Sequence, residues 1–273
     1  MMRNVLICCF LLLLCACNQD RQKAAALLTR AESCYEQEQY AIAKSLIDSL
    51  NKIYPNEFTV RKESRNLMRK IESDEQSRNL AFCDSMLLEE KARVEILKQP
   101  FILEKHDEYD EIGKYILPSQ LIEKNLQKTY LRCGVNEQGE MYIASVYYGA
   151  KAINHNQLRI VAPDGSYAET QWVPRDGALN YSFSDNGMIS EIVTYQQSKE
   201  NGVIAFIYSL SKIQLKAELI DEKKCYSFVI SESDKQSIAA TRDLAVALTN
   251  IEQLSRETEK VKARIDFLNA KSK

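Results

Sequence analysis

The sequence predicts an α+β protein in which an antiparallel β domain is inserted between two long helices. Residues 58–99 and 235–270 hold apolar residues at helical spacing and contain neither glycine nor proline. Residues 129–231 instead alternate apolar and polar side chains in short runs separated by turn residues. The 273 residues carry 36 basic and 38 acidic side chains and an apolar share of 45%. This composition is typical of a globular protein of one or two domains.

The chain begins with a short apolar run that indicates a secretion signal. Arg3 precedes an uninterrupted apolar stretch, Val5–Ala16, and polar residues follow from Asn18 onward. A transmembrane helix needs about 20 apolar residues, whereas the apolar core of a signal peptide needs about 7–15. We therefore interpret residues 1–16 as a signal peptide.

The end of this run, Leu14 to Cys17, resembles the lipobox of bacterial lipoproteins. The departure from the family pattern is Cys15, where a small or hydroxyl residue is usual. The resemblance implies cleavage before Cys17, lipidation of its thiol and acylation of the new amino terminus with a fatty acid such as palmitate. Asn18 after the lipidated cysteine favours the outer membrane, so the expected location is the cell envelope, facing the periplasm. The alternative is an ordinary cleaved signal with incidental cysteines.

Residues 17–57 predict a pair of helices that ends at a proline, which cannot continue a helix. The segment Leu27–Pro55 resembles one tetratricopeptide repeat, which implies two closely packed antiparallel helices. Arg30 and Gln39 depart from that pattern, and the sequence holds no second full copy, although such repeats usually need about three copies to be stable. A lone helical hairpin packed on the next helix is an equal alternative to a peptide-binding repeat. The matching positions are Ala31, Tyr40, Ala43, Ile47 and Pro55.

Residues 58–99 and 233–273 predict two long helices that form an antiparallel coiled-coil stalk. Pro100 ends the first helix, and Ser233 and Asp234 are candidate caps for the second. Matched lengths on either side of the β domain favour pairing within one chain. A parallel homodimer through the C-terminal helix is the alternative. The a and d positions of the second helix are Leu244, Ala247, Ile251, Leu254, Thr258, Val261, Ile265 and Leu268.

Residues 100–128 read as a connector, and residues 129–232 as an antiparallel β domain. Glu104–Glu111 is acidic and includes His106, and we interpret it as a solvated surface and not as a metal site. Asp-Gly and Asn-Gly pairs between the strands supply the positive φ angles that tight hairpins need. A sandwich, a strongly bent sheet and a small barrel are all compatible with this pattern. The expected strands are 129–135, 140–148, 158–162, 167–173, 180–184, 188–196, 203–210, 213–219 and 225–230.

The remaining cysteines and the charge balance exclude several classes of site. Cys34, Cys83, Cys133 and Cys225 show no Cys-x-x-Cys spacing, which argues against zinc and thioredoxin-type chemistry. A disulfide between Cys133 and Cys225 and four free thiols are both open, and free thiols are favoured. The net charge of −2 gives no basic field for nucleic acid.

We expect no enzyme activity, no cofactor and no bound metal, because the sequence contains no recognisable catalytic motif. Its two histidines are His106 and His155. Glu191 is the best candidate for an acid with a raised pKa, since it interrupts an apolar strand and shares a face with Ile189 and Val193. The favoured alternative is a glutamate at the sheet margin, paired with a lysine or arginine.

Two classes of function remain. In the first, the lipoprotein is a binding or scaffold module that meets an envelope protein partner while the lipid holds it to the membrane. In the second, the β domain binds a glycan or another small ligand through Tyr147, Tyr148, Trp172 and Tyr195. Packing in the core is the alternative role of these rings, since tyrosine and tryptophan are enriched both in strands and at binding surfaces.

Overall fold

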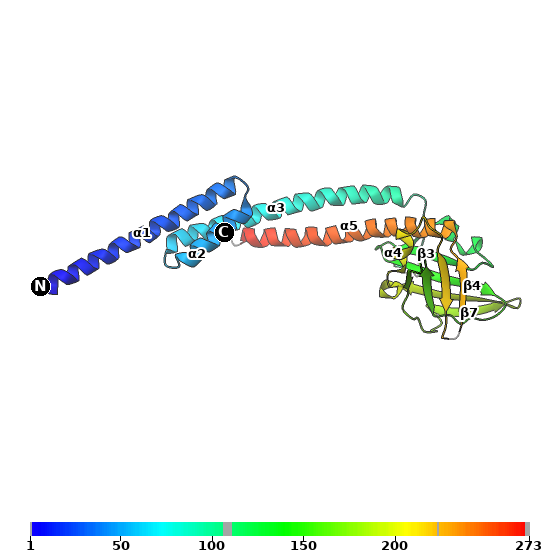
Figure 1. Ribbon diagram of the computed structural model, residues 1–273. Coiled ribbons are helices and arrows are strands. Elements are labelled where there is room, and N and C mark those ends of the chain that lie inside the picture. The colour runs from blue at the N-terminus through cyan, green and yellow to red at the C-terminus, as the bar shows by residue number, and fades with distance from the viewer. Residues whose placement is uncertain (1, 106–110, 223, 271–273) are drawn as a thin grey trace. The chain divides into compact units, whose positions relative to one another are not determined.

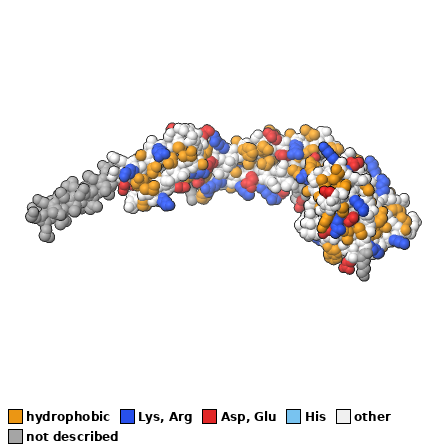
Figure 2. All heavy atoms as spheres, viewed as in Figure 1, with side chains coloured by type: hydrophobic (Ala, Val, Ile, Leu, Met, Phe, Trp, Pro, Cys, Tyr) orange, Lys and Arg blue, Asp and Glu red, His pale blue; other side chains and the backbone are white. Residues whose placement is uncertain are grey.

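The computed structural model describes residues 2–105, 111–222 and 224–270, with side chains from residue 19 onward (Figure 1). This part of the chain combines helices with two antiparallel sheets, which confirms the predicted α+β class. None of the described helices is long and apolar enough to cross a membrane. Basic and acidic side chains are interspersed over the visible face (Figure 2).

The chain divides into two compact units. We call Met1–Ser85 with Ser255–Lys273 the helical unit, and Met86–Leu254 the β unit. Two helices, α3 (Phe58–Leu97) and α5 (Glu232–Ala270), contribute residues to both.

The helical unit is built on α1 (Met2–Glu36), α2 (Tyr40–Ile53) and the first part of α3. Small side chains line the contact, which lets the helix axes approach closely. The Tyr35 hydroxyl donates to Asp74 at 2.6 Å and so ties α1 to α3. The fully buried residues of this core are Ala24, Ala31, Ala43, Ile47, Leu50 and Ile71.

In the β unit, the strands form one six-stranded and one four-stranded sheet, and all pairs are antiparallel. Neither set of described strands closes on itself, so the small barrel considered from the sequence is wrong. The six-stranded sheet has the order β1 (Ile102–Glu104), β2 (Lys114–Ile116), β3 (Tyr130–Asn136), β4 (Met141–Gly149), β8 (Met188–Gln196), β7 (Asn180–Asp185). The four-stranded sheet has the order β10 (Cys225–Val229), β9 (Lys216–Ile220), β5 (Gln157–Val161), β6 (Tyr167–Glu169).

One buried cluster draws residues from both sheets. Leu131 and Cys133 of β3 belong to it, as do Leu158 and Ile160 of β5. Residues two apart in a strand share a face, so the alternation that predicts strands also selects the residues facing this core.

The predicted strand at residues 203–210 is wrong, because this segment is the helix α4 (Val203–Ser209). Its apolar run offers no period-two alternation, and a short run of this kind fits a buried helix as well as a strand. In the helix, Val203, Ile204 and Ile207 are buried, at the spacing of one helical face. Gly202 precedes them with φ of 84°, a conformation that glycine adopts without strain.

Three short 3₁₀ helices complete the described part of the fold. They are η1 (Pro118–Gln120), η2 (Ile122–Lys124) and η3 (Gln197–Glu200). The first two lie in the stretch that the sequence presented as a connector, which also contributes β1 and β2 to the six-stranded sheet.

The helix α5 begins earlier than its predicted caps. Ser231 precedes it, and the Ser231 hydroxyl accepts a hydrogen bond from the Asp234 backbone N–H at 3.0 Å. Ser231 therefore has the capping role that the sequence assigned to Ser233 and Asp234. Within the β unit, Asn250 of α5 donates to Glu90 of α3 at 3.1 Å.

Cys133 and Cys225 are free thiols. Cys133 is buried in the six-stranded sheet, whereas Cys225 is exposed on the four-stranded sheet. Burial raises the pKa of the Cys133 thiol to about 12.

Candidate functional site

The outer face of the six-stranded sheet carries a row of apolar and aromatic side chains. The strand register places Tyr130 beside Val146, and Val146 beside Ile192. Ile192 in turn lies beside Tyr181. The row therefore crosses four strands, and because cross-strand neighbours lie about 4.5–5.5 Å apart, its side chains touch.

A second row lies beside the first. Ser190 on β8 stands between Tyr148 on β4 and Phe183 on β7. Because serine is small, its position leaves space between the two aromatic rings. On the other side of the first row, Arg132 of β3 is paired in register with Ala144, another small residue.

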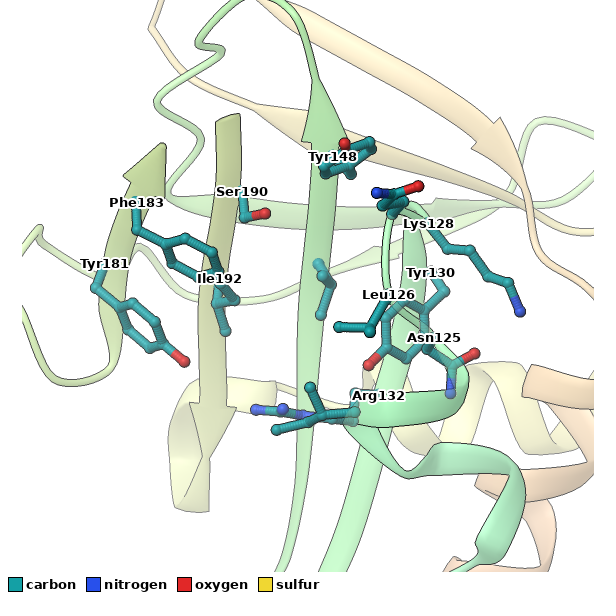
Figure 3. A pocket seen from close by; sticks show the side chains of 13 residues that line it. Asn125, Leu126, Lys128, Tyr130, Arg132, Tyr148, Tyr181, Phe183, Ser190 and Ile192 are labelled. Carbon is teal, nitrogen blue, oxygen red and sulfur yellow. The ribbon is translucent and has the colours of Figure 1, made fainter. Parts of the chain in front are cut away.

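These rows form the floor of a cavity of about 300 Å³ (Figure 3). The segment of residues 122–128, which precedes β3, forms the wall above this floor and supplies Leu126 and Lys128. We call this cavity the sheet pocket. Its volume lies at the lower end of the range for small-molecule sites, about 300–1,000 Å³.

Hydrogen bonds fix the wall segment, residues 122–128, in place. The Asn125 side-chain amide donates to the backbone carbonyls of Ser119 at 2.7 Å and Leu121 at 2.9 Å. At the end of the segment, the Thr129 hydroxyl accepts from the Tyr148 backbone N–H at 3.0 Å. The wall is therefore attached both to its own turn and to the strand that lines the floor.

The charge of the sheet pocket is positive. Arg132 and Lys128 line it, and none of the described acidic residues does. The Nε atom of Arg132 is buried and has no hydrogen-bond partner. Burial raises the pKa of the Tyr130 phenol, and the nearby Arg132 charge partly offsets that rise.

A second constellation lies in the core on the opposite face of the sheet. The Ser145 Oγ is 2.8 Å from Nε2 of His155, and Nδ1 of His155 is 2.9 Å from Oε2 of Glu191. Glu191 also accepts hydrogen bonds from the backbone N–H groups of Ile153, Asn154 and His155 at 2.7, 2.9 and 3.2 Å. The carboxylate of β8 thus secures the loop between β4 and β5.

The order serine, histidine, carboxylate is that of a nucleophilic triad, but this one is enclosed. Ser145 is fully buried, and His155 and Glu191 are 1% and 2% exposed. A substrate has to reach the serine oxygen for such a group to act. The arrangement as it stands therefore satisfies polar groups in the core, which burial makes obligatory.

Glu191, the candidate for an acid with a raised pKa, does not have one. Burial by itself would raise it, but the hydrogen bonds from His155 and the backbone outweigh burial, and the pKa is lowered. The alternative, a lysine or arginine partner at the sheet margin, is also wrong, because the partner is His155. Glu191 is buried on the face that it shares with Val193.

The four aromatic residues chosen from the sequence do not form one surface. Tyr147 and Tyr195 are buried in the core, where the Tyr147 hydroxyl donates to the Lys151 carbonyl at 2.9 Å. Tyr148 lines the sheet pocket on the opposite face. Trp172 is 57% exposed and lies beyond the end of β6.

Sequence reasoning missed most of the sheet pocket. Alternation along β3 does place Tyr130 and Arg132 on one face, and alternation along β7 does the same for Tyr181 and Phe183. These two pairs lie in one pocket only because of the register between strands that are about 50 residues apart in the chain. A local sequence pattern does not encode that register.

Two residues singled out from the sequence lie where the structure describes no side chains. Cys17 lies in α1 among residues whose side chains are not described, and His106 lies outside the described residues. Within the described part of the chain, no group of three or more histidine, cysteine or acidic residues could hold a metal ion.

Comparisons with known proteins found no relative of this chain. The chain matches no protein-family model, and it has no match among the curated proteins or the solved structures compared with it.

Proposed function

We propose that this chain is a lipid-anchored lipoprotein of the bacterial cell envelope whose β unit binds a small ligand in the sheet pocket. The observation that carries the proposal is the pocket itself. Four aromatic rings and an incompletely paired arginine converge on a cavity of about 300 Å³. Small-molecule sites are concave, mostly apolar and equipped with few polar groups, and the sheet pocket has each of these properties.

The anchor part of the proposal rests on the first residues. The apolar run ends at a lipobox-like Leu14–Cys17, which supports cleavage before Cys17 and acylation of this residue. Lipid chains on one residue would hold the protein at a membrane, since each buried CH₂ contributes about 0.8 kcal/mol. The outer membrane is the proposed location, because Asn18 follows the cysteine that would carry the lipid.

The long helices have a proposed role as an antiparallel coiled-coil stalk, with α1 and α2 as a tetratricopeptide-like hairpin. Contacts inside each unit support this. In the helical unit, Arg264 of α5 donates to Glu72 of α3 at 2.9 Å. In the β unit, Val94 of α3 shares a buried cluster with Leu244 and Ala247 of α5. Pairing within one chain accounts for these contacts without the alternative homodimer.

The experiment uses a neutral probe, so that it tests the cavity and not its charge. In saturation-transfer NMR, 2-phenylethanol should bind the purified protein with a Kd of about 1 mM, as expected for a ligand with few atoms. Ser190→Trp should abolish binding, because the indole fills the space between Tyr148 and Phe183. Ser166→Trp, at an exposed turn of the other sheet, is the matched control and should bind normally. Equal binding by both variants would contradict the proposal.

A protein scaffold is the second candidate function, and an open strand edge favours it. The strand β10 is the outer strand of the four-stranded sheet. The Ile230 N–H donates to Leu215, and the Asp221 N–H donates to the Lys224 carbonyl, each at 2.9 Å. Antiparallel ladders bond alternate residues, so the N–H and C=O of Ser227 face away from the sheet. Such an edge can accept an extended peptide of an envelope protein.

Photo-crosslinking in the native envelope tests the second candidate. A photoreactive residue at Ser227 should link to one defined protein partner, whereas the same residue at Ser166 should not. Ser227→Pro in the same chain should then remove the partner, since proline lacks the N–H that the peptide would bond. Identical crosslinks from both positions would rule the edge out as a specific docking site.

The proposed function involves binding without turnover. Ser145, His155 and Glu191 are the one serine–histidine–carboxylate relay among the described hydrogen bonds, and each is buried. Their burial supports a structural role for the relay.

A further inference from the structure

We propose that the sheet pocket selects a small carboxylate carried by an apolar ring, with the carboxylate on Arg132 and the ring on the aromatic rows. This inference rests on the proposed ligand-binding function and adds the chemical class of the ligand. It depends on the state of the Arg132 side chain, the sign of the charge around it and the shape of the floor.

Arg132 has capacity to bind an anion. Its guanidinium has five N–H donors in a planar fork. Its positive charge acts on the nearby Tyr130 phenol, and the buried Nε has no hydrogen-bond partner. No described carboxylate forms a salt bridge with it, in contrast to Arg159 on β5, which lies 2.9 Å from Glu169. An unpaired buried donor is costly, so an acceptor that enters the pocket gains by meeting it.

The surrounding charge favours an anion over a cation or a neutral molecule. Lys128 adds a second positive charge, and the residues that line the pocket include no acid. Asp234 acts on the Tyr130 phenol, but it lies outside the lining and receives a hydrogen bond from the Gln120 side chain. Lys128 interacts electrostatically with Asp234, whereas Arg132 forms no salt bridge with a described carboxylate. A cationic ligand would therefore be repelled mainly by Arg132.

The floor favours a flat apolar body. Val146 and Ile192 are cross-strand neighbours that line it. The rings of Tyr148, Tyr181 and Phe183 line it as well (Figure 3). Aromatic rings prefer offset or edge contacts with other rings, and this arrangement offers both. The volume of about 300 Å³ accommodates one ring with a short arm.

A carboxylate fits the donor set better than a phosphate. One guanidinium fork matches two carboxylate oxygens in a bidentate pair. A phosphate dianion has three terminal oxygens and twice the charge, and the single fork of Arg132 satisfies it incompletely. The two anions share the same recognition chemistry, so the test includes both.

The test compares three ligands of one shape by isothermal titration calorimetry and NMR, and it adds phenyl phosphate as the phosphate counterpart of the anionic ligand. Phenylacetate, 2-phenylethanol and 2-phenylethylamine carry the same ring with an anionic, neutral or cationic arm. Phenylacetate should bind about tenfold more tightly than 2-phenylethanol, as a charge-assisted bidentate contact provides, and 2-phenylethylamine should bind most weakly. The Nε–H resonance of Arg132 should shift with phenylacetate alone.

Variants assign the preference to Arg132. Arg132→Gln should reduce the affinity for phenylacetate about tenfold relative to that for 2-phenylethanol, with circular dichroism confirming the fold. Arg132→Lys keeps the charge but lacks the fork, so it should retain part of the preference. Arg159→Gln, on the other sheet, is the matched control and should behave as the unmodified protein.

Three outcomes would overturn the inference. Equal affinity for all three ligands would remove the carboxylate preference while leaving the pocket function intact. An unchanged preference in Arg132→Gln would assign it to another group. Tighter binding of phenyl phosphate than of phenylacetate would replace carboxylate with phosphate. Failure of every ligand to bind would instead contradict the proposed function itself.

Discussion

Glu191 accepts a hydrogen bond from Nδ1 of His155 at 2.9 Å, and both side chains are almost fully buried. With that nitrogen as the donor, Nε2 of a neutral ring accepts from the Ser145 hydroxyl. The Tyr195 hydroxyl lies 3.4 Å from the same serine oxygen and extends the network. Burial raises the pKa of Tyr195. The network links β4, β8 and the loop before β5.

Glu191→Gln should destabilise the protein by about 3 kcal/mol, as loss of one member of a buried pair does. The glutamine NH₂ group would face N–H donors of His155, where the carboxylate accepts. Urea unfolding followed by circular dichroism measures the change. Glu169→Gln, at a partly exposed ion pair with Arg159, is the control and should cost at most about 1 kcal/mol. Similar losses in the two variants would argue that the network contributes little.

The lowered pKa of Glu191 predicts acid sensitivity. A glutamate has a pKa of about 4.3 in an unfolded chain, and the folded value lies below it. The stabilisation from Glu191 is therefore complete above about pH 4.3 and is lost as the pH falls through the folded pKa. Unfolding free energies from pH 6 down to pH 3 should decline more steeply in the unmodified protein than in Glu191→Gln. Parallel profiles would show that another group causes the loss.

Cys17→Ser should abolish lipid attachment. The expected product is a soluble or unprocessed chain, detected by fractionation and by the absence of fatty-acid label. Full membrane association of a correctly cleaved Cys17→Ser chain would contradict the anchor. Cys34→Ser offers a control cysteine outside the lipobox, and it should fractionate like the unmodified protein.

Gly139 joins β3 to β4 where the turn meets α5. Its φ is 86°, and an added Cβ would lie 2.5 Å from the Thr249 hydroxyl and 2.8 Å from the Ala245 carbonyl. Gly165 has the same φ in another hairpin but has open space around it. Gly139→Ala should therefore lower the unfolding free energy about 1–3 kcal/mol more than Gly165→Ala, which carries the backbone strain alone. Equal losses would mean that the turn can move away from the helix.

The strand pattern was largely readable because hairpins are local. The DNG turn illustrates this. Asn186 and Gly187 both have positive φ, at 51° and 79°, as a two-residue turn between paired strands requires. The failure at residues 203–210 has the opposite cause. Its residues are apolar on every side, and a local run of that kind leaves helix and strand equally open until the surrounding core selects one.

The sequence by itself predicted the long helices and the hairpin turns, and its first residues resemble a lipobox signal. These properties depend on residues within a few positions of one another. The tertiary structure alone decided that Arg132 and Tyr181 share one pocket and that Glu191 meets His155 and not a basic residue. Both outcomes follow from the register and packing of strands distant in the chain, and a shift of one residue in that register would turn each side chain to the other face of the sheet.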